Sequence, residues 1–309
     1  MVEDLSDTPA GELTLTEALL HVPGFSLQHP AVQVSGLPGG SLNRSYSVST
    51  PAGRFVLRLS RGPDAWLTTD RSVELRLHAA ASEAGIAPRI VESRDQWLIT
   101  EYVPGRLWTE PDFGAAARLA SLARTLAKLH RLPAPDYGRF DLLGTLSDYA
   151  ERVGESGGLV DFAAAAWESS GGAGRTPAIL HHDLHGSNII EGPRGLVLVD
   201  WECAAVSDPL LDVACILSYH ESAGPHAAVL LEHCGLPEVT PRQLAACVWL
   251  FDLHTYLWYR ERQSRMAPTQ TEREAEKRLA ARLPRTLREW HPGAYGKVLT
   301  GASGVESAN

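Results

Sequence analysis

The sequence predicts an α+β fold with two lobes, a small antiparallel sheet followed by a larger, mainly helical part. The chain has 309 residues, which is long enough for two lobes that each enclose a core. Short strand-like runs separated by turn residues dominate up to about residue 104, and Ala/Leu-rich runs with apolar residues at helical spacing dominate after it. We therefore expect one lobe over residues 1–104 and a second over residues 105–309.

The first lobe is expected to begin with a short helix over residues 13–21, followed by an antiparallel series of strands with a longer helix beside it. The longer helix is expected to end before Gly85-Ile86-Ala87-Pro88, because this sequence cannot continue a helix. A last strand leads into Pro104-Gly105, which we expect to link the lobes. The expected strands are 32–35, 45–50, 54–59 and the run ending at Glu101, and the longer helix is expected over 69–84.

The second lobe is expected to consist mostly of helices. Apolar residues recur there every three or four positions, and Asp208-Pro209 is a typical helix start. The expected helices are 113–132, 143–153, 159–169, 244–263 and 269–289.

Composition and charge narrow the class of protein. Hydrophobic residues make up 44% of the chain and charged residues 21%, as in ordinary globular proteins. The net charge of −9 argues against nucleic acid or an anionic membrane as the main partner, and it is compatible with a cationic substrate. The four cysteines lack CxxC spacing, the N-terminus has no signal-peptide pattern, and no apolar run approaches the about 20 residues of a membrane span. These features predict a cytoplasmic protein with reduced thiols.

The stretch Ile179–Asp200 carries the chemistry. Two short apolar runs, 178–180 and 196–199, are expected to be strands around a polar segment. This segment holds Asp183 and, five residues later, Asn188, and Asp200 ends the second run. Two carboxylates and a carboxamide that converge supply a group that orients a hydroxyl and oxygen ligands for Mg²⁺. The stretch therefore indicates phosphoryl transfer.

Other interpretations of the same stretch remain open. His181, His182 and His185 beside Asp183 also suit a metal hydrolase, although Gly186-Ser187-Asn188 is loop sequence and no HExxH is present. A surface hairpin with polar residues is the simplest structural alternative. A nucleotide binder without catalytic activity is a third, and the presence of both carboxylates and the carboxamide argues against it.

The spacing H-x-D-x-x-x-x-N, followed by an apolar strand and Asp200-Trp201-Glu202, resembles the aminoglycoside phosphotransferase/choline kinase superfamily. Within it the sequence is most similar to the choline kinase and thiamine kinase branch. The resemblance implies a bilobal protein-kinase-like fold and the use of ATP and Mg²⁺. It also implies that Asp183 is the catalytic base and that Asn188 and Asp200 hold the metal.

The resemblance assigns the nucleotide to the first lobe. The glycine-containing loop 36–44 lies where a hairpin covers the phosphates, and its candidate contacts are Gly40, Ser41 and Asn43. Arg58 follows on the next strand, where kinases usually carry Lys, and Glu74 near the start of the next helix is its expected ion-pair partner. The carbonyl of Glu101 and the N–H of Val103 are expected to bind the adenine.

The acceptor is expected to bind at the C-terminal helices. Trp249, Asp252, Tyr256 and Tyr259 share one face of helix 244–263, and aromatic rings with a carboxylate suit a cation. The alternative is a helix whose rings only fill the core. Glu202 is a further candidate for substrate contact.

Two residues are expected to support the catalytic loop, namely His181 and Asp212, of which Asp212 would hold the backbone of residues 181–183. The sequence thus predicts an ATP-dependent kinase that phosphorylates a hydroxyl of a small cationic alcohol, related to choline, thiamine or amino alcohols. An aminoglycoside or a sugar is the alternative acceptor.

Overall fold

The structure, a computed structural model, describes residues 15–29, 31–37, 43–60, 70–155, 157–172 and 174–291. The chain forms two compact units, each assembled from two segments. Unit 1 consists of Met1–Thr109 and Gly186–Ala204, and unit 2 consists of Glu110–His185 and Ala205–Asn309. The α+β class predicted from the sequence is confirmed, since one unit contains an antiparallel sheet and the other is mainly helical.

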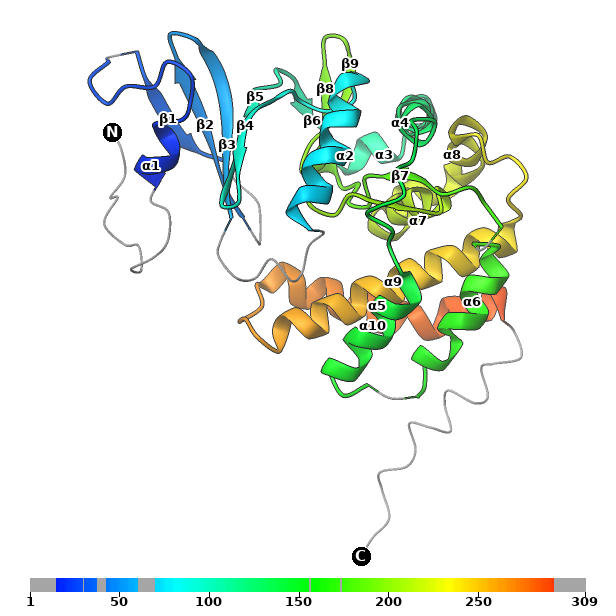
Figure 1. Cartoon of the computed structure of the whole chain (residues 1–309). Helices are drawn as coiled ribbons and strands as arrows, with labels where there is room; N and C mark the ends of the chain where they lie inside the picture. Colours follow the sequence, from blue (N-terminus) through cyan, green and yellow to red (C-terminus); the bar gives the residue numbers. More distant parts are fainter. Residues whose placement is uncertain are drawn as a thin grey trace, which may run out of the picture. The chain divides into compact units, whose positions relative to one another are not determined.

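Unit 1 contains an antiparallel five-stranded sheet in the order β1-β2-β3-β5-β4 (Figure 1). Three of its strands lie where the sequence predicted them, and the strand ending at Glu101 is also present. The strand β4 was not predicted, because its Ile90–Arg94 segment is short and half polar. The strands are β1 Gln33–Gly36, β2 Asn43–Thr50, β3 Gly53–Ser60, β4 Ile90–Arg94 and β5 Trp97–Glu101.

Two helices accompany this sheet in unit 1. The short helix α1 (Leu15–Leu19) packs on the sheet through Ala18 and Leu19 and encloses an apolar core with Leu57 and Ile99, which are fully buried. The helix α2 (Arg71–Glu83) begins at Asp70, whose carboxylate accepts the N–H of Ser72. Such a cap satisfies one of the donors that a helix start leaves without a partner.

A second sheet of unit 1 has three strands and lies next to the candidate metal ligands in the chain. Its order is β6-β8-β9, from Arg106–Leu107, Ile189–Gly192 and Gly195–Leu198. The strand-like run at 196–199 is thus a strand that pairs with β8. The run at 178–180 is also a strand, β7 (Ala178–Leu180), but it pairs with β10 (Ala205–Ser207) in unit 2.

Unit 2 is built from helices around that two-stranded pair. The five helices predicted there by range are present with shifted ends, the first being divided into α3 and α4, and the helix predicted to start at Asp208-Pro209 is α7. The helix α8 and the 3₁₀ segments were not predicted. The helices are α3 Glu110–Phe113, α4 Ala116–His130, α5 Leu142–Arg152, α6 Ala163–Ser170, α7 Leu210–Tyr219, α8 Ala227–Cys234, α9 Pro241–Gln263 and α10 Gln270–Trp290.

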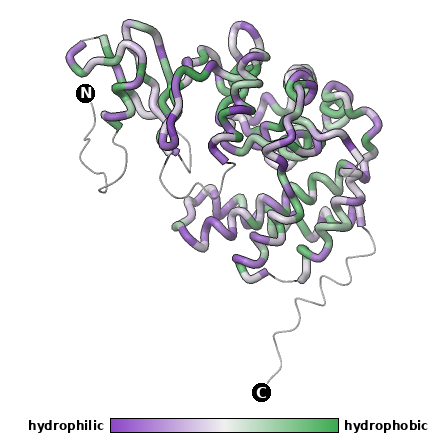
Figure 2. The backbone as a smooth tube through the Cα atoms, viewed as in Figure 1, coloured by the Kyte–Doolittle hydropathy of each residue, from purple (hydrophilic) through white to green (hydrophobic). Residues whose placement is uncertain are grey.

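The longest helices, α9 and α10, follow each other in the chain and pack against each other as a helical hairpin in unit 2 (Figure 1). Each begins with a capping box, at Thr240 and Thr269 respectively, in which the threonine hydroxyl accepts the third N–H of the helix. Their connection and the last turn of α9 are hydrophilic, whereas hydrophobic residues predominate in the middle of α9 (Figure 2). Among the described residues, no helix is long and apolar enough to cross a membrane.

The division of the chain into two domains, 1–104 and 105–309, remains a prediction. The compact units instead place residues 186–204 with the sheet-containing unit, because β8 pairs with β6 and Leu198 N donates to Ile86 O at 2.7 Å. All four cysteines are free thiols, as expected.

Candidate active site

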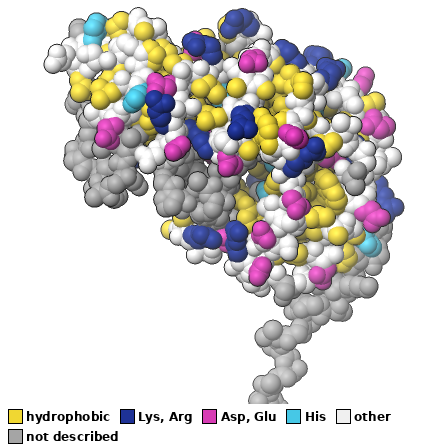
Figure 3. Space-filling view, in the orientation of Figure 1, with side chains coloured by type: hydrophobic (Ala, Val, Ile, Leu, Met, Phe, Trp, Pro, Cys, Tyr) yellow, Lys and Arg dark blue, Asp and Glu magenta, His cyan; other side chains and the backbone are white. Residues whose placement is uncertain are grey.

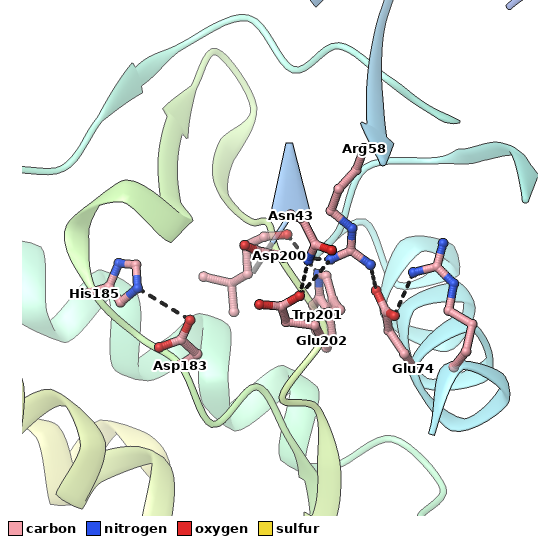
Figure 4. A network of polar contacts seen from close by, with 10 residues as sticks. Asn43, Arg58, Glu74, Asp183, His185, Asp200, Trp201 and Glu202 are labelled. Atoms are coloured by element: carbon pink, nitrogen blue, oxygen red, sulfur yellow. Dashed lines mark hydrogen bonds and ion pairs between the residues drawn. The ribbon is translucent and has the colours of Figure 1, made fainter. Parts of the chain in front are cut away.

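Arg58 on β3 is the centre of a buried ionic network in unit 1. Its guanidinium pairs with Glu74, and its Nη1 lies 2.6 Å from Asp200 Oδ1 and 3.7 Å from Glu202 Oε2. Figure 4 shows Arg58 pointing between Glu74 on α2 and the carboxylates that follow β9. The Arg58–Glu74 ion pair predicted from the sequence is therefore present, and Asp200 is an additional partner that was not foreseen.

The protonation of this network follows from its charges. Burial disfavours the charged form of Arg58, but Glu74, Asp200 and Glu202 outweigh it and raise the pKa of Arg58. Burial also acts against the charged form of Glu74, and Arg58 and Arg71 more than compensate, so that the pKa of Glu74 is lowered. Two guanidiniums, those of Arg58 and Arg71, thus face the three carboxylates of Glu74, Asp200 and Glu202, which leaves one negative charge in excess.

The hairpin β8–β9 brings the two predicted metal ligands to one end of the strands. Asn188 immediately precedes β8, and its carbonyl accepts the N–H of Val199 at 3.0 Å. Asp200 follows Val199 in the chain. Asn188 and Asp200 therefore both lie just beyond the Ile189–Leu198 pair, at the same end of the hairpin. Asp200 also adopts φ of +64°, a left-handed backbone that non-glycine residues rarely take.

The donors at this end of the hairpin fit magnesium. Mg²⁺ is usually held by one or two protein oxygens together with substrate phosphates and water, and not by a cage of side chains. Asn188 and Asp200 supply such oxygens. The described part of the chain has no group of three or more His, Cys, Asp or Glu side chains suited to a metal.

The candidate phosphate loop is described only at its two ends. Gly40 and Ser41 lie outside the described residues. Asn43, the first residue of β2, is buried, and its amide donates to Glu202 Oε2. This contact ties the end of the loop to the segment Asp200-Trp201-Glu202.

The predicted adenine contacts lie at the end of β5. Glu101 is the last residue of that strand, and Tyr102 N donates to Arg54 O at 3.0 Å, so Val103 follows directly after the sheet pairing ends. Gly105 then passes close to β8. A Cβ at this position would come within 2.5 Å of Ile190 Cγ2 and 2.6 Å of Glu191 O, so only glycine fits here.

In unit 2, the catalytic loop after β7 is held by Asp212 of α7. The Asp212 carboxylate accepts the backbone N–H of His182 at 2.8 Å and of His181 at 3.3 Å. His130 Nε2 donates to Asp212 Oδ2 at 2.8 Å, the oxygen that also accepts the N–H of His181. Asp212 is fully buried, and although burial opposes its charge, the bonds from His130 and the backbone lower its pKa.

Asp183 itself follows two buried histidines. His182 has φ of +66°, and burial lowers its pKa. Asp183 is only half-buried, and its Oδ2 lies 3.3 Å from Nε2 of the more exposed His185 (Figure 4). The candidate catalytic loop thus combines a strained backbone at His182 with a partly exposed carboxylate at Asp183.

Comparison with known proteins assigns the chain to a family. Residues 33–247 match the family described as "Phosphotransferase enzyme family". The chain belongs to this phosphotransferase family. It is 29% identical over 253 residues to a thiamine kinase of Shigella boydii serotype 4, an alignment that covers 78% of this chain and 86% of the relative.

Solved structures agree on the fold of this phosphotransferase. A choline/ethanolamine kinase family protein from Mesorhizobium loti is similar with a TM-score of 0.73 at 19% identity, covering 92% of this chain and 97% of that one. The choline kinase LicA from Streptococcus pneumoniae has a TM-score of 0.69 at 18% identity, covering 82% and 94%. LicA has also been solved in complex with AMP.

Family membership establishes the class of reaction. The chain is an ATP-dependent phosphotransferase that uses Mg²⁺ and acts on a hydroxyl group of a small molecule. The recognition of this superfamily from the sequence is confirmed. The roles of individual residues remain predictions.

Two residues that were expected to bind the acceptor, Trp249 and Asp252, are buried inside this phosphotransferase. Trp249 is fully buried, packs on Trp290 and donates its indole N–H to Leu283 O at 3.0 Å. Asp252 is fully buried with Arg282 at 2.9 Å and Ser218 Oγ at 2.6 Å. Both expectations are corrected, because the shared helix face of α9 is covered by α10 and α7.

Tyr256 differs from these two residues. It is half-buried on α9, and Arg260 Nη1 donates to its hydroxyl at 2.8 Å. Burial raises the pKa of Tyr256, so its hydroxyl keeps its proton at neutral pH. Its contact with the acceptor stays a prediction.

Three contacts of the site were not predicted from the sequence. His130 had been interpreted as part of a core helix, although a histidine at the end of an otherwise apolar helix face indicates a polar partner. Arg71 binds Glu74 Oε2 at 2.7 Å and lies three residues before it, a spacing visible in the sequence. The stacking of His78 on Trp201 has no such local signal, since 123 residues separate them.

Proposed function

We propose that this phosphotransferase transfers the γ-phosphate of ATP to a hydroxyl of a small cationic alcohol, with thiamine and its close analogues as the first candidates. The similarity to the thiamine kinase, which extends over 78% of the chain, carries the proposal. The solved choline kinase and choline/ethanolamine kinase neighbours support a cationic alcohol more generally through their common fold.

In this proposal, unit 1 holds the nucleotide. Arg58 offers guanidinium N–H donors to phosphate oxygens, and Glu74 keeps the guanidinium charged and oriented. The loop with Gly40, Ser41 and Asn43 covers the phosphates, and the Glu101 carbonyl with the Val103 N–H receives the adenine. Binding of phosphates requires Arg58 to share or release its 2.6 Å contact with Asp200.

Asn188 and Asp200 would hold the magnesium ion, which, when bound, neutralises charge on the phosphate oxygens. Arg58 adds a second positive charge beside the same carboxylate. The Asp200 carboxylate already pairs with a cationic group, the Arg58 guanidinium at 2.6 Å.

Asp183 accepts or orients the proton of the acceptor hydroxyl. Its half-buried carboxylate remains reachable, and His185 Nε2 at 3.3 Å restrains the orientation of the carboxylate. Asp212 and His181 fix the backbone from which Asp183 projects. Orientation and charge neutralisation, more than the basicity of Asp183, supply the rate in such reactions.

The acceptor is expected to contact Glu202 and Tyr256. A carboxylate and an aromatic ring attract a cation, each by about 0.5–2 kcal/mol at partly exposed positions. Trp249 and Asp252 take no part, since both are buried in the packing of α9. An aminoglycoside or a sugar remains the alternative acceptor, because membership of the phosphotransferase family is also compatible with it.

We further propose that the protein acts in the cytoplasm on small molecules alone. On the face drawn in Figure 3, acidic and basic side chains of the described residues are interspersed, without a continuous basic surface. The net charge of −9 also disfavours nucleic acid and anionic membranes as partners.

Steady-state ADP release with MgATP tests the proposal across a panel of acceptors. The panel contains thiamine, choline, ethanolamine, an aminoglycoside and a neutral hexose, and kcat/KM is compared for each. We expect thiamine or another cationic alcohol to give the highest kcat/KM. A preference for the hexose, or nucleotide binding without turnover of any acceptor, would contradict the proposed substrate class.

A further inference from the structure

A closed ring of contacts in unit 1 connects the nucleotide and metal residues to the helix α2. Glu74 of α2 pairs with Arg58, and Arg58 pairs with Asp200. Trp201 follows Asp200 in the chain, and its indole stacks on the imidazole of His78, with ring centroids 5.8 Å apart and an interplanar angle of 23°. His78 lies on α2 one turn after Glu74, which closes the ring.

The two members on α2 belong to one face of the helix. Residues four apart in a helix project from the same side, so a rotation of α2 moves Glu74 and His78 together. Both side chains are buried, with exposed fractions of 3% for Glu74 and 2% for His78. The stacking of His78 on Trp201 therefore sets the position from which Glu74 reaches Arg58.

Three hydrogen bonds to backbone carbonyls further connect Trp201 and His78 to the neighbouring segments. Its indole N–H donates to Leu198 O at 2.9 Å, and Leu198 N donates to Ile86 O at 2.7 Å. Ile86 lies in the segment that follows α2. His78 Nε2 donates to Pro88 O in this segment at 2.8 Å, since a carbonyl only accepts.

His78 thus has two separate functions in the ring. Its imidazole packs on Trp201, and its N–H fixes the segment that holds β9. An alanine lacks both functions, and a phenylalanine retains the ring but lacks the donor. A histidine is suited to this position because it offers an aromatic face and a buried donor in one side chain.

We propose that His78 is a positioning residue for nucleotide binding, which sets the Glu74–Arg58–Asp200 network through its stacking on Trp201 and its hydrogen bond to Pro88. The inference rests on the proposed function, because it assumes that this network receives MgATP. It assigns a role to a residue that touches neither the phosphates nor the metal ligands directly.

The test measures the dissociation constant of MgATP by calorimetry, and KM for MgATP and for the acceptor, in a set of variants. The variants are His78→Ala, His78→Phe, Glu74→Gln and the double variant His78→Ala/Glu74→Gln. His21→Ala is the matched control, because His21 also contacts a tryptophan ring in unit 1, Trp97 at 4.7 Å, but lies outside the network.

We expect His78→Ala to raise the dissociation constant and KM for MgATP about tenfold, with KM for the acceptor within about twofold of wild type. His78→Phe should show about a threefold rise, because it keeps the ring contact. The double variant should bind about as weakly as Glu74→Gln alone, since both changes disable the same network. His21→Ala should match wild type.

The outcomes separate the inference from the proposed function. If wild type does not bind MgATP, the proposed function is wrong. If wild type binds MgATP and folded His78→Ala and His78→Phe bind it equally well, only the positioning role is refuted. Lower melting temperatures with unchanged MgATP affinity would likewise refute it, since they indicate that His78 only stabilises the fold. If His78→Ala does not fold, His78→Phe alone decides between these results.

Discussion

Asp212 illustrates how single residues of this chain act through the backbone. Its carboxylate lies beneath the catalytic loop and accepts hydrogen bonds from three donors, two backbone N–H groups and the imidazole of His130. A fully buried carboxylate is stable only when such donors surround it. The left-handed backbone of His182 depends on this support, because a strained residue persists only where its surroundings hold it.

Asp212→Asn tests this support. The amide NH₂ group would face donors and lose at least one bond, so we expect a loss of about 2–4 kcal/mol in the free energy of unfolding and a lower kcat. Urea denaturation and steady-state kinetics measure both effects. Asp148→Asn, at an exposed position of α5, is the control. Equal stability and kcat in the two variants would contradict the role of Asp212.

At the residue scale, the sequence predicted contacts correctly where two charged residues lie at the positions that the family resemblance assigns to an ion pair. Arg58 and Glu74 were expected to pair, and they do. Prediction from helical spacing failed for Trp249 and Asp252, because a helix face that carries rings and a carboxylate looks alike whether it binds a cation or is covered by another helix. Only the packing of α10 on α9 distinguishes these cases.

At the scale of elements, the hairpin β8–β9 decides where the metal ligands lie. It belongs to a sheet with β6, and this pairing requires a close approach between Gly105 and the backbone of β8. The sequence indicated β9 as a strand because it is apolar. It did not indicate β6 or β8, because β6 has only two residues and β8 follows its two isoleucines with a glutamate and a glycine.

Gly105→Ala is expected to displace this hairpin. The added Cβ would lie 2.5 Å from Ile190 Cγ2 and 2.6 Å from Glu191 O, and such overlap costs about 1–3 kcal/mol. We expect a lower free energy of unfolding and a weaker affinity for MgATP. Gly224→Ala serves as the comparison, since its Cβ would meet nothing within 4 Å. If both alanines were tolerated equally, the close approach at Gly105 would be of no consequence.

At the scale of the whole molecule, the order of strand-like and helical runs was enough to predict an α+β chain with a sheet-containing part first. The division into units was harder to predict, because residues 186–204 join the sheet-containing unit through pairing with residues far away in the sequence. Such pairings depend on tertiary structure and cannot be predicted from a local sequence pattern.

The stability of the molecule is also expected to depend on pH. Burial lowers the pKa of His254 to about 3, and His182, which stacks near it, is shifted in the same direction. Below pH 6.5 His254 gains a proton in the unfolded chain, whereas in the folded chain it stays neutral until the pH approaches about 3. Stability is therefore lost as the pH falls below about 6.5, by about 1.4 kcal/mol per pH unit for His254, and the lowered pKa of His182 adds to this loss.

Urea denaturation at a series of pH values measures this loss, with His254→Phe as the variant. The aromatic replacement keeps ring contacts with Phe140 and Phe251 but cannot take up a proton. Its stability should fall less steeply than that of wild type between pH 6.5 and 4.5. Identical slopes would mean that His254 titrates normally in the folded protein.

The central claim is that Asp183 serves the transfer of phosphate from MgATP to an acceptor hydroxyl. The most direct measurement compares acceptor-dependent ADP release by wild type and Asp183→Asn, together with the affinity of each for MgATP. We predict that the variant loses about 10²–10⁴-fold in kcat, the usual contribution of a positioned base, while its MgATP affinity stays within about twofold. Undiminished ADP release by Asp183→Asn would contradict the account.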